Sequence, residues 1–160
     1  MRVAQTVHTT GTSMSASAER LGSVVRAFGR LDAPVLWAVH PRTRKNLERF
    51  GLGSELAATT NVRVLDPLSY LDTNGLLRCA RALLTDSGGM QKEAYFFGVP
   101  CVTMREETEW VETVQLGWNV LTGTDEERIV SAVTTLPRGT QRPPVYGDGH
   151  AAEKIAGALG

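Results

Sequence analysis

Cysteine is nearly absent from the sequence. Cys79 and Cys101 are the only two among 160 residues, which is too few for a disulfide scaffold. Both lie in apolar sequence contexts, so we expect two buried free thiols. A protein without structural disulfides is typical of a reducing compartment, and we therefore expect a cytoplasmic location.

A surplus of either charge is missing too. Lysine and arginine together number 17, as do aspartate and glutamate, so no overall field would draw the protein to nucleic acid or to a membrane surface. No apolar run approaches the length of a transmembrane helix, and the start MRVAQTVH lacks the apolar core of a signal peptide. We expect no nucleic acid and no membrane among its partners.

Metal-binding and dinucleotide-binding patterns are also lacking. The three histidines, His8, His40 and His150, do not have the spacing of metal ligands. The pattern GxGxxG, typical of dinucleotide-binding reductases, does not occur. The sequence therefore predicts neither a metal site nor a cofactor.

What the chain does have is an alternation of strand-like and helix-like segments. Short apolar runs predict strands at residues 3–8, 35–39, 61–66, 83–86, 99–104 and 118–121. Amphipathic segments predict helices between them, with caps at Ser17, Asp72, Ser87 and Asp125, while residues 53–60 are expected to form a linker.

This alternation indicates an α/β fold with a Rossmann-like, doubly wound parallel sheet. The length suffices for one domain and not for two large ones, so we expect residues 1–160 to form a single domain. Ligands on such sheets bind outside the carboxyl ends of the strands. That edge is expected to carry His8, His40, Asp66, Ser87 and Arg105.

Residues 83–104, LLTDSGGMQKEAYFFGVPCVTM, read as a strand, a glycine turn, a helix and a second strand. Glycines at such a turn let the backbone approach a ligand closely, and the first N–H groups of the helix have no partner within it. A helix start of this kind attracts anions, phosphate above all. Ser87-Gly88-Gly89 is thus a candidate phosphate site, with Glu93 on the second turn. The alternative is that these residues only turn the chain into a helix.

Three segments together resemble a known family: TDSGGMQKEA, GVPCVTMREETEWVETVQLGWNVLTGTD and YGDGHAAEKI. They are similar to the carboxy-terminal domain of the non-hydrolysing UDP-N-acetylglucosamine 2-epimerases. AVHPRTRKNLERFG and NVRVLDPLSYLD fit the same domain upstream, in the right order. The resemblance implies one of the two Rossmann-like domains of a GT-B arrangement, in which the substrate lies in the cleft between the domains.

The resemblance also implies roles for individual residues. Ser87, Gly88 and Gly89 would bind the diphosphate of a UDP-sugar, and Glu93 would accept hydrogen bonds from the ribose hydroxyls. These roles suit the chemistry, because a carboxylate accepts from two neighbouring hydroxyls and a helix start favours anions.

Two further residues have competing interpretations. His8 aligns with a family histidine near the diphosphate, or it is a strand-end histidine satisfied by its surroundings. Arg105 lies in a family loop that faces the cleft, where it could offset the ligand's charge, or it is paired with Glu106 or Glu109.

The chain departs from the family pattern in ways that bear on binding. Residues 9–11, Thr-Thr-Gly, stand where the family usually has basic and acidic residues. Thr73 and Asn74 replace apolar or aromatic residues in a region that packs on the uracil in the family. Both changes predict weaker contacts with the nucleotide.

The expected function is therefore one half of a UDP-N-acetylglucosamine 2-epimerase, an isomerase, that binds UDP-N-acetylglucosamine or UDP. In the family, the carboxylates that transfer protons lie in the amino-terminal domain, so the catalytic residues are unknown here. The expected partner is an amino-terminal epimerase half or, in a homodimer, a second copy. The alternatives are a nucleotide-sugar-binding or regulatory module without catalysis, and half of a GT-B glycosyltransferase.

Overall fold

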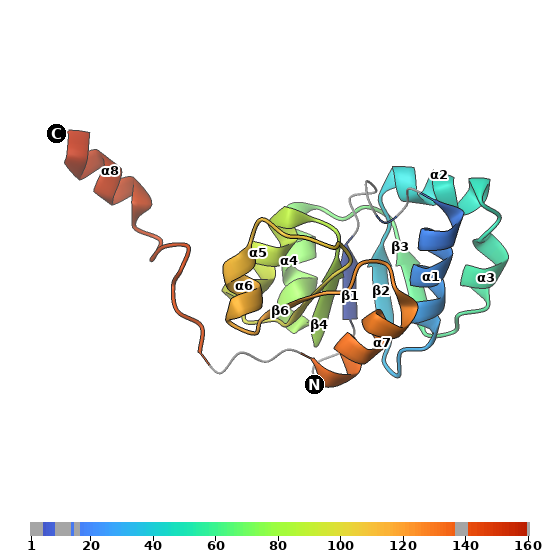
Figure 1. The fold of residues 1–160 in the computed structure, drawn as a ribbon. Helices are drawn as coiled ribbons and strands as arrows, with labels where there is room; N and C mark the ends of the chain where they lie inside the picture. Colours follow the sequence, from blue (N-terminus) through green and yellow to red (C-terminus); the bar gives the residue numbers. More distant parts are fainter. Residues whose placement is uncertain (1–4, 9–13, 15–16, 137–140, 160) are drawn as a thin grey trace.

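The protein contains one six-stranded sheet in which all neighbouring strands are parallel (Figure 1). The computed structural model describes residues 5–8, 14, 17–136 and 141–159. The strands are β1 Gln5–His8, β2 Val35–Ala38, β3 Val62–Leu65, β4 Ala82–Thr85, β5 Cys101–Thr103 and β6 Asn119–Leu121. Their order, β3-β2-β1-β4-β5-β6, is that of a doubly wound Rossmann-like sheet. The predicted fold class is confirmed.

Helices cover both faces of the sheet. The helices are α1 Ala18–Gly29, α2 Pro41–Arg49, α3 Gly53–Ala57, α4 Tyr70–Cys79, α5 Gly88–Phe97, α6 Val111–Gln115, α7 Glu126–Thr135 and α8 Ala151–Leu159. The larger apolar core joins α1 and α7 to one face, and a smaller core joins α4 and α5 to the other. Figure 1 shows the same division, with α1 and α7 together and α4, α5 and α6 on the far side of the strands.

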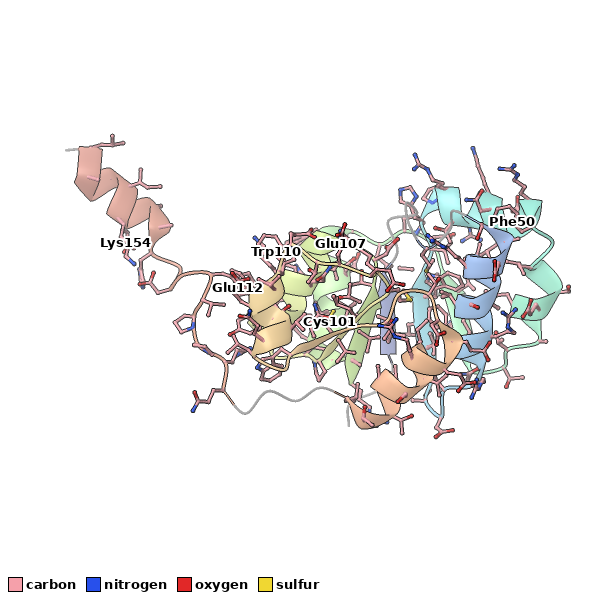
Figure 2. All side chains as sticks on the ribbon, in the orientation of Figure 1. Phe50, Cys101, Glu107, Trp110, Glu112 and Lys154 are labelled. Atoms are coloured by element: carbon pink, nitrogen blue, oxygen red, sulfur yellow. The ribbon has the colours of Figure 1, made fainter. Side chains whose placement is uncertain are left out.

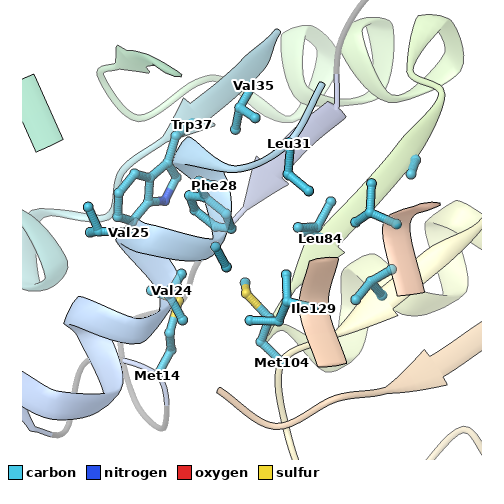
Figure 3. Packing of buried hydrophobic residues seen from close by; sticks show 14 of the residues in the cluster. Met14, Val24, Val25, Phe28, Leu31, Val35, Trp37, Leu84, Met104 and Ile129 are labelled. Atoms are coloured by element: carbon cyan, nitrogen blue, oxygen red, sulfur yellow. The ribbon is translucent and has the colours of Figure 1, made fainter. Parts of the chain in front are cut away.

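The larger core is built around α1 and β2. Phe28 and Trp37 are fully buried and meet edge to face, with ring centroids 5.2 Å apart (Figure 3). Aromatic pairs prefer this geometry because the positive edge of one ring meets the negative face of the other. The apolar stripe predicted for α1 is confirmed, since Leu21, Val24 and Val25 are also fully buried.

β4 shows why its sequence is apolar throughout rather than alternating. Leu84 points into the larger core and Leu83 into the smaller one, because successive side chains of a strand face opposite sides of the sheet. Every residue of β4 is buried, as expected for a parallel strand that is covered by helices on both faces.

Three local predictions differ from the structure. The expected linker at 53–60 contains helix α3, whose residue Leu56 packs against the larger core. The cap of α4 is Ser69 and not Asp72: the Ser69 Oγ accepts from the Asp72 N–H at 3.2 Å and donates to the Asp72 carboxylate at 2.6 Å. Cys79 is exposed because it ends α4 on the outer side, whereas Cys101 is buried as expected.

Helix α8 extends away from the rest of the protein (Figure 1). All of its described residues are exposed, including Ile155 at 61% and Leu159 at 84%. The polar contacts found among its described residues are local, as in the 2.8 Å ion pair between Lys154 and Asp148. Within the described residues, no helix is both long and apolar enough to cross a membrane.

Charged side chains join α1 to α7. The Glu126 carboxylate accepts from Arg26 Nε at 3.0 Å and from Arg30 Nη1 at 2.8 Å. These hydrogen bonds, from Arg30 first and Arg26 second, hold the pKa of Glu126 below its usual value. The Glu126 side chain is 23% exposed, so solvent screens this cluster only in part.

Replacing Glu126 with glutamine should lower the free energy of unfolding by about 1 kcal/mol. Since the pKa of Glu126 is lowered on folding, its stabilisation is complete above the ordinary glutamate pKa and is lost as the pH falls through the lowered value. The difference in melting temperature between wild type and variant should therefore shrink from about pH 6 to about pH 3. Glu127→Gln serves as control and should have a smaller effect, because this side chain is 76% exposed.

Candidate functional site

The ends of the strands form a single row across the sheet. Strand pairing sets the last residue of each strand level with that of its neighbours: His8, Ala38, Leu65, Thr85, Thr103 and Leu121. The loops that follow therefore leave the sheet at the same edge. This confirms that the chain positions of His40, Asp66, Ser87 and Arg105 lie along the edge at which ligands of such sheets bind.

The start of α5 lies near the middle of this edge. Ser87 occupies the N-cap position with an extended backbone, but its hydroxyl makes no capping bond. Its backbone N–H instead donates to Thr85 Oγ1 at 3.0 Å. Gly88 and Gly89 form the first turn, and the nearest atom to a Cβ added at Gly89 would be Ser87 Oγ at 4.0 Å. The predicted cap is therefore right in position, while the hydroxyl remains available for another partner.

Glu93 follows on the second turn of α5. It is half-buried, and its Oε1 accepts a hydrogen bond from the Tyr70 hydroxyl at 3.2 Å. Tyr70 begins α4 and is 67% exposed. The phenol thus holds one carboxylate oxygen in place beside the glycine turn.

The loop after β5 lies over the start of α5. Arg105 forms an ion pair with Glu109, with 3.1 Å between Nη1 and Oε2. A Cβ added at Gly88 would overlap the Glu109 carboxylate, so only glycine permits this close approach. Of the two interpretations of Arg105, the structure shows the pairing with Glu109, while Glu106 pairs with Arg128 at 3.6 Å.

A buried polar network holds this loop to α5 and β6. Gln91 Oε1 accepts from Thr108 Oγ1 at 2.6 Å and from Asn119 Nδ2 at 3.0 Å. Thr103 Oγ1 donates to Asn119 Oδ1 at 2.8 Å, and the Trp110 N–H donates to Thr108 Oγ1 at 3.0 Å. Gln91 and Asn119 were not predicted from the sequence. A glutamine between apolar positions of a helix and an asparagine within a strand were the available signals.

Trp110 packs between this loop and the segment before α8. The Lys92 ammonium lies 4.3 Å from its ring centroid, and the Tyr146 ring meets it edge to face at 5.5 Å. Burial, followed by the neighbouring Glu112 carboxylate, raises the pKa of Tyr146 to about 12. The buried Trp110 Nε1 has no hydrogen-bond partner among the described residues. Figure 2 shows Trp110 and Glu112 beside α6, with Glu107 farther along the same loop.

A cavity of about 320 Å³ opens at the same edge, between the start of α1 and the loops after β5 and β6. It is lined by Arg20, Met104, Arg105, Glu106, Glu107, Gly123 and Thr124. Two arginines and a helix start make this cavity suitable for an anionic group, while two glutamates limit how much negative charge it accepts.

Other residues expected at this edge make local contacts. His40 caps α2, its Nδ1 accepting from the Arg42 N–H at 3.2 Å. Asp66 pairs with Arg44 at 2.8 Å. His8 ends β1, level with Thr85, and its side chain lies outside the described part of the structure. The edge therefore brings Ser87, Gly88, Gly89, Glu93 and Arg105 together, with His8 adjacent by backbone position.

The described residues contain no cluster of metal ligands, and the thiol of Cys101 is unreactive. Within residues 5–8, 14, 17–136 and 141–159, no group of three histidine, cysteine, aspartate or glutamate side chains is placed to hold a metal ion. Burial raises the pKa of the Cys101 thiol to about 12, so it stays protonated at neutral pH and is not a nucleophile.

The strand order and the glycine helix start at the carboxyl edge define the class of this protein, a Rossmann-like α/β domain. The chain belongs to the UDP-N-acetylglucosamine 2-epimerase family, whose model matches residues 3–160. The resemblance to the carboxy-terminal domain of that family is thereby confirmed. The fold is one half of the GT-B arrangement found in the family's structures.

Relatives and solved structures agree with this membership. The chain is 41% identical over 142 residues to a UDP-N-acetylglucosamine 2-epimerase homolog of Methanococcus maripaludis, covering 88% of this chain and 40% of the relative. It is 49% identical to the UDP-2,3-diacetamido-2,3-dideoxy-D-glucuronate 2-epimerase of Pseudomonas aeruginosa, covering 86% and 38%. A structure of the Methanocaldococcus jannaschii epimerase superposes with a TM-score of 0.87 at 30% identity, covering 99% and 46%. The chain therefore spans less than half the length of these relatives.

Replacing Thr108 with valine should lower the free energy of unfolding by about 1–2 kcal/mol, because Gln91 Oε1 and the Trp110 N–H both lose a partner. Chemical denaturation of the two proteins measures the difference. Thr134→Val is the matched control: its hydroxyl donates to the Val130 carbonyl at 2.8 Å on an exposed part of α7. Equal losses in the two variants would show that the buried network contributes nothing beyond an ordinary exposed hydrogen bond.

Proposed function

We propose that this domain binds the UDP part of a UDP-sugar and supplies the nucleotide-binding half of a UDP-N-acetylglucosamine 2-epimerase, an isomerase. The observation that carries the proposal is the start of α5, where Ser87, Gly88 and Gly89 precede Glu93 by one helical turn. A diphosphate suits the N–H groups of the first turn. Vicinal ribose hydroxyls suit the carboxylate on the next.

The electrostatics of the edge support the same assignment. Arg105 is 27% exposed and its guanidinium already holds a carboxylate, so the environment is suited to an anionic oxygen. Tyr70 donates to one Glu93 oxygen, which leaves the other oxygen for a ligand hydroxyl. His8, at the end of the neighbouring strand β1, is part of the proposed site.

The ligands named for the relatives have a common part, which indicates the ligand class of this domain. One M. jannaschii epimerase structure, 32% identical with a TM-score of 0.86, is a complex with UDP-GlcNAc and UDP. The P. aeruginosa relative acts on a UDP-linked diacetamido glucuronate. Both names contain UDP and an acetamido sugar. The proposal therefore commits to UDP, with UDP-N-acetylglucosamine as the favoured sugar nucleotide.

Two carboxylates of the loop after β5 are already engaged by arginines. Glu109 is paired with Arg105 and Glu106 with Arg128, so neither is free to take a proton from a sugar carbon. The family resemblance assigns the proton-transferring groups to an amino-terminal domain. The catalytic residues of the complete enzyme are proposed to lie there.

Exposed apolar groups favour such a partner. Tyr70 and Leu71 are 67% and 79% exposed beside the proposed site, and helix α8 presents Ile155 and Leu159 to solvent. Exposed apolar patches on a folded domain commonly mark interfaces. An amino-terminal epimerase half is the proposed partner, with a homodimer as the alternative.

UDP should bind the protein while NAD does not, as measured by isothermal titration calorimetry. Replacing Glu93 with glutamine should weaken UDP binding about ten-fold, because hydrogen bonds from the ribose hydroxyls lose their charged acceptor. Glu112→Gln is the matched control, since Glu112 also accepts from a tyrosine hydroxyl, that of Tyr146, at 3.3 Å. If Glu93→Gln lowered the melting temperature without changing the affinity for UDP, Glu93 would serve the fold alone.

The chain by itself should not interconvert UDP-N-acetylglucosamine and UDP-N-acetylmannosamine, because the family resemblance assigns the proton-transferring carboxylates to an amino-terminal domain and Glu106 and Glu109 are held in ion pairs. Proton NMR of the sugar nucleotide after long incubation checks this. Formation of the manno epimer, with contaminating epimerase excluded, would mean that the domain contains its own proton-transferring groups.

A further inference from the structure

Glu109 lies where an anionic ligand would meet α5. Its carboxylate fills the space beside Gly88 that a side chain would otherwise take. Gly88 is the first residue of α5, and the start of a helix carries a partial positive charge. The Trp110 Nε1 is also close, 3.5 Å from the position of a Cβ at Gly88. One intramolecular carboxylate thus occupies a favourable place for a negative charge at this edge.

Glu109 would also compete with a ligand phosphate for the positive groups around it. The charge of Arg105 suits a ligand phosphate, and Glu109 holds this guanidinium with 3.1 Å between Nη1 and Oε2. The indole N–H of Trp110 is buried and has no acceptor among the described residues. An oxygen placed beside Gly88 in exchange for the carboxylate would gain Arg105 as a partner and lie close to a free donor.

The backbone around Glu109 is anchored while its side chain is not. Thr108 on one side is bonded to Gln91, and the Trp110 N–H on the other side is bonded to Thr108. The Glu109 side chain is 48% exposed. Its carboxylate can therefore leave Gly88 by rotation of the side chain into solvent, with the loop unchanged.

We propose that Glu109 is a built-in anion that occupies the place beside Gly88 and is displaced when a diphosphate binds there. This inference rests on the proposed function of the same site. Binding is then an exchange of one anion for another at the start of α5. The affinity for a diphosphate is reduced by the contacts that Glu109 must give up.

Removing the charge of Glu109 should therefore strengthen diphosphate binding. Inorganic pyrophosphate, titrated against the whole chain and followed by amide NMR shifts, should bind Glu109→Gln roughly three to ten times more tightly than wild type. Glu109→Ala removes the side chain beside Gly88 altogether, and its affinity for pyrophosphate should rise by at least as much. Uridine, which carries no phosphate, should bind all three proteins equally.

Glu112→Gln is the matched control. Glu112 follows Glu109 by three residues, and its carboxylate accepts from the Tyr146 hydroxyl at 3.3 Å, so its replacement removes the same charge without emptying the place at Gly88. It should change the affinity for pyrophosphate by less than two-fold. Melting curves of the variants exclude a loss of fold as the cause of any difference.

The outcomes separate this inference from the proposed function. Unchanged or weaker pyrophosphate binding in Glu109→Gln would overturn the inference, as would an equal gain in Glu112→Gln, while UDP binding by wild type would still support the proposed function. Conversely, tighter pyrophosphate binding in the Glu109 variants, with UDP bound no better than pyrophosphate, would uphold the exchange of anions and reject the nucleotide assignment.

Discussion

β4 lies in the middle of the sheet, hydrogen-bonded to β1 on one side and to β5 on the other. Because all pairings are parallel, the carboxyl ends of these strands meet at one edge, where Thr85 is level with His8 and Thr103. The glycine turn after β4 is therefore flanked by the loop after β5. Without this register, Glu109 could not reach Gly88, and Arg105 would not lie near the start of α5.

The second constraint is a network of buried polar side chains. Gln91, Thr108 and Asn119 connect α5, the loop and β6 through hydrogen bonds of 2.6 and 3.0 Å. Burying these groups without partners would cost free energy, so each fixes the others in place. The network explains how a loop with four charged residues between positions 105 and 109 stays ordered over the helix start: buried hydrogen bonds attach it to α5 and β6, while its carboxylates face the ligand edge.

The fold was predictable to a large extent, and the reasons are local. Apolar runs separated by amphipathic segments identified all six strands, although the ends of β5 were placed one or two residues too far out. Helix α3 was missed because five residues are too few for periodicity to show. Ser69 was overlooked as the cap of α4 in favour of Asp72, although serine followed three residues later by an acidic residue is a capping pattern.

At the site, the residue types that favour anion binding were recognisable, and the roles of Ser87, Gly88, Gly89, Glu93, His8 and Arg105 toward UDP remain predictions. The sequence also left two partners open for Arg105. Only the structure shows the ion pair with Glu109, because the choice depends on where the loop after β5 lies over α5, the helix that follows the neighbouring strand β4.

The sequence by itself determined the α/β class, the position of the glycine helix start and the family, since each depends on residues adjacent along the chain. The tertiary structure decided which carboxylate occupies that helix start, which glutamine supports the loop, and that α8 is left without a surface to cover it. These features join residues from different strands and helices. Their contacts exist only after parallel pairing has brought the ends of the strands to one edge.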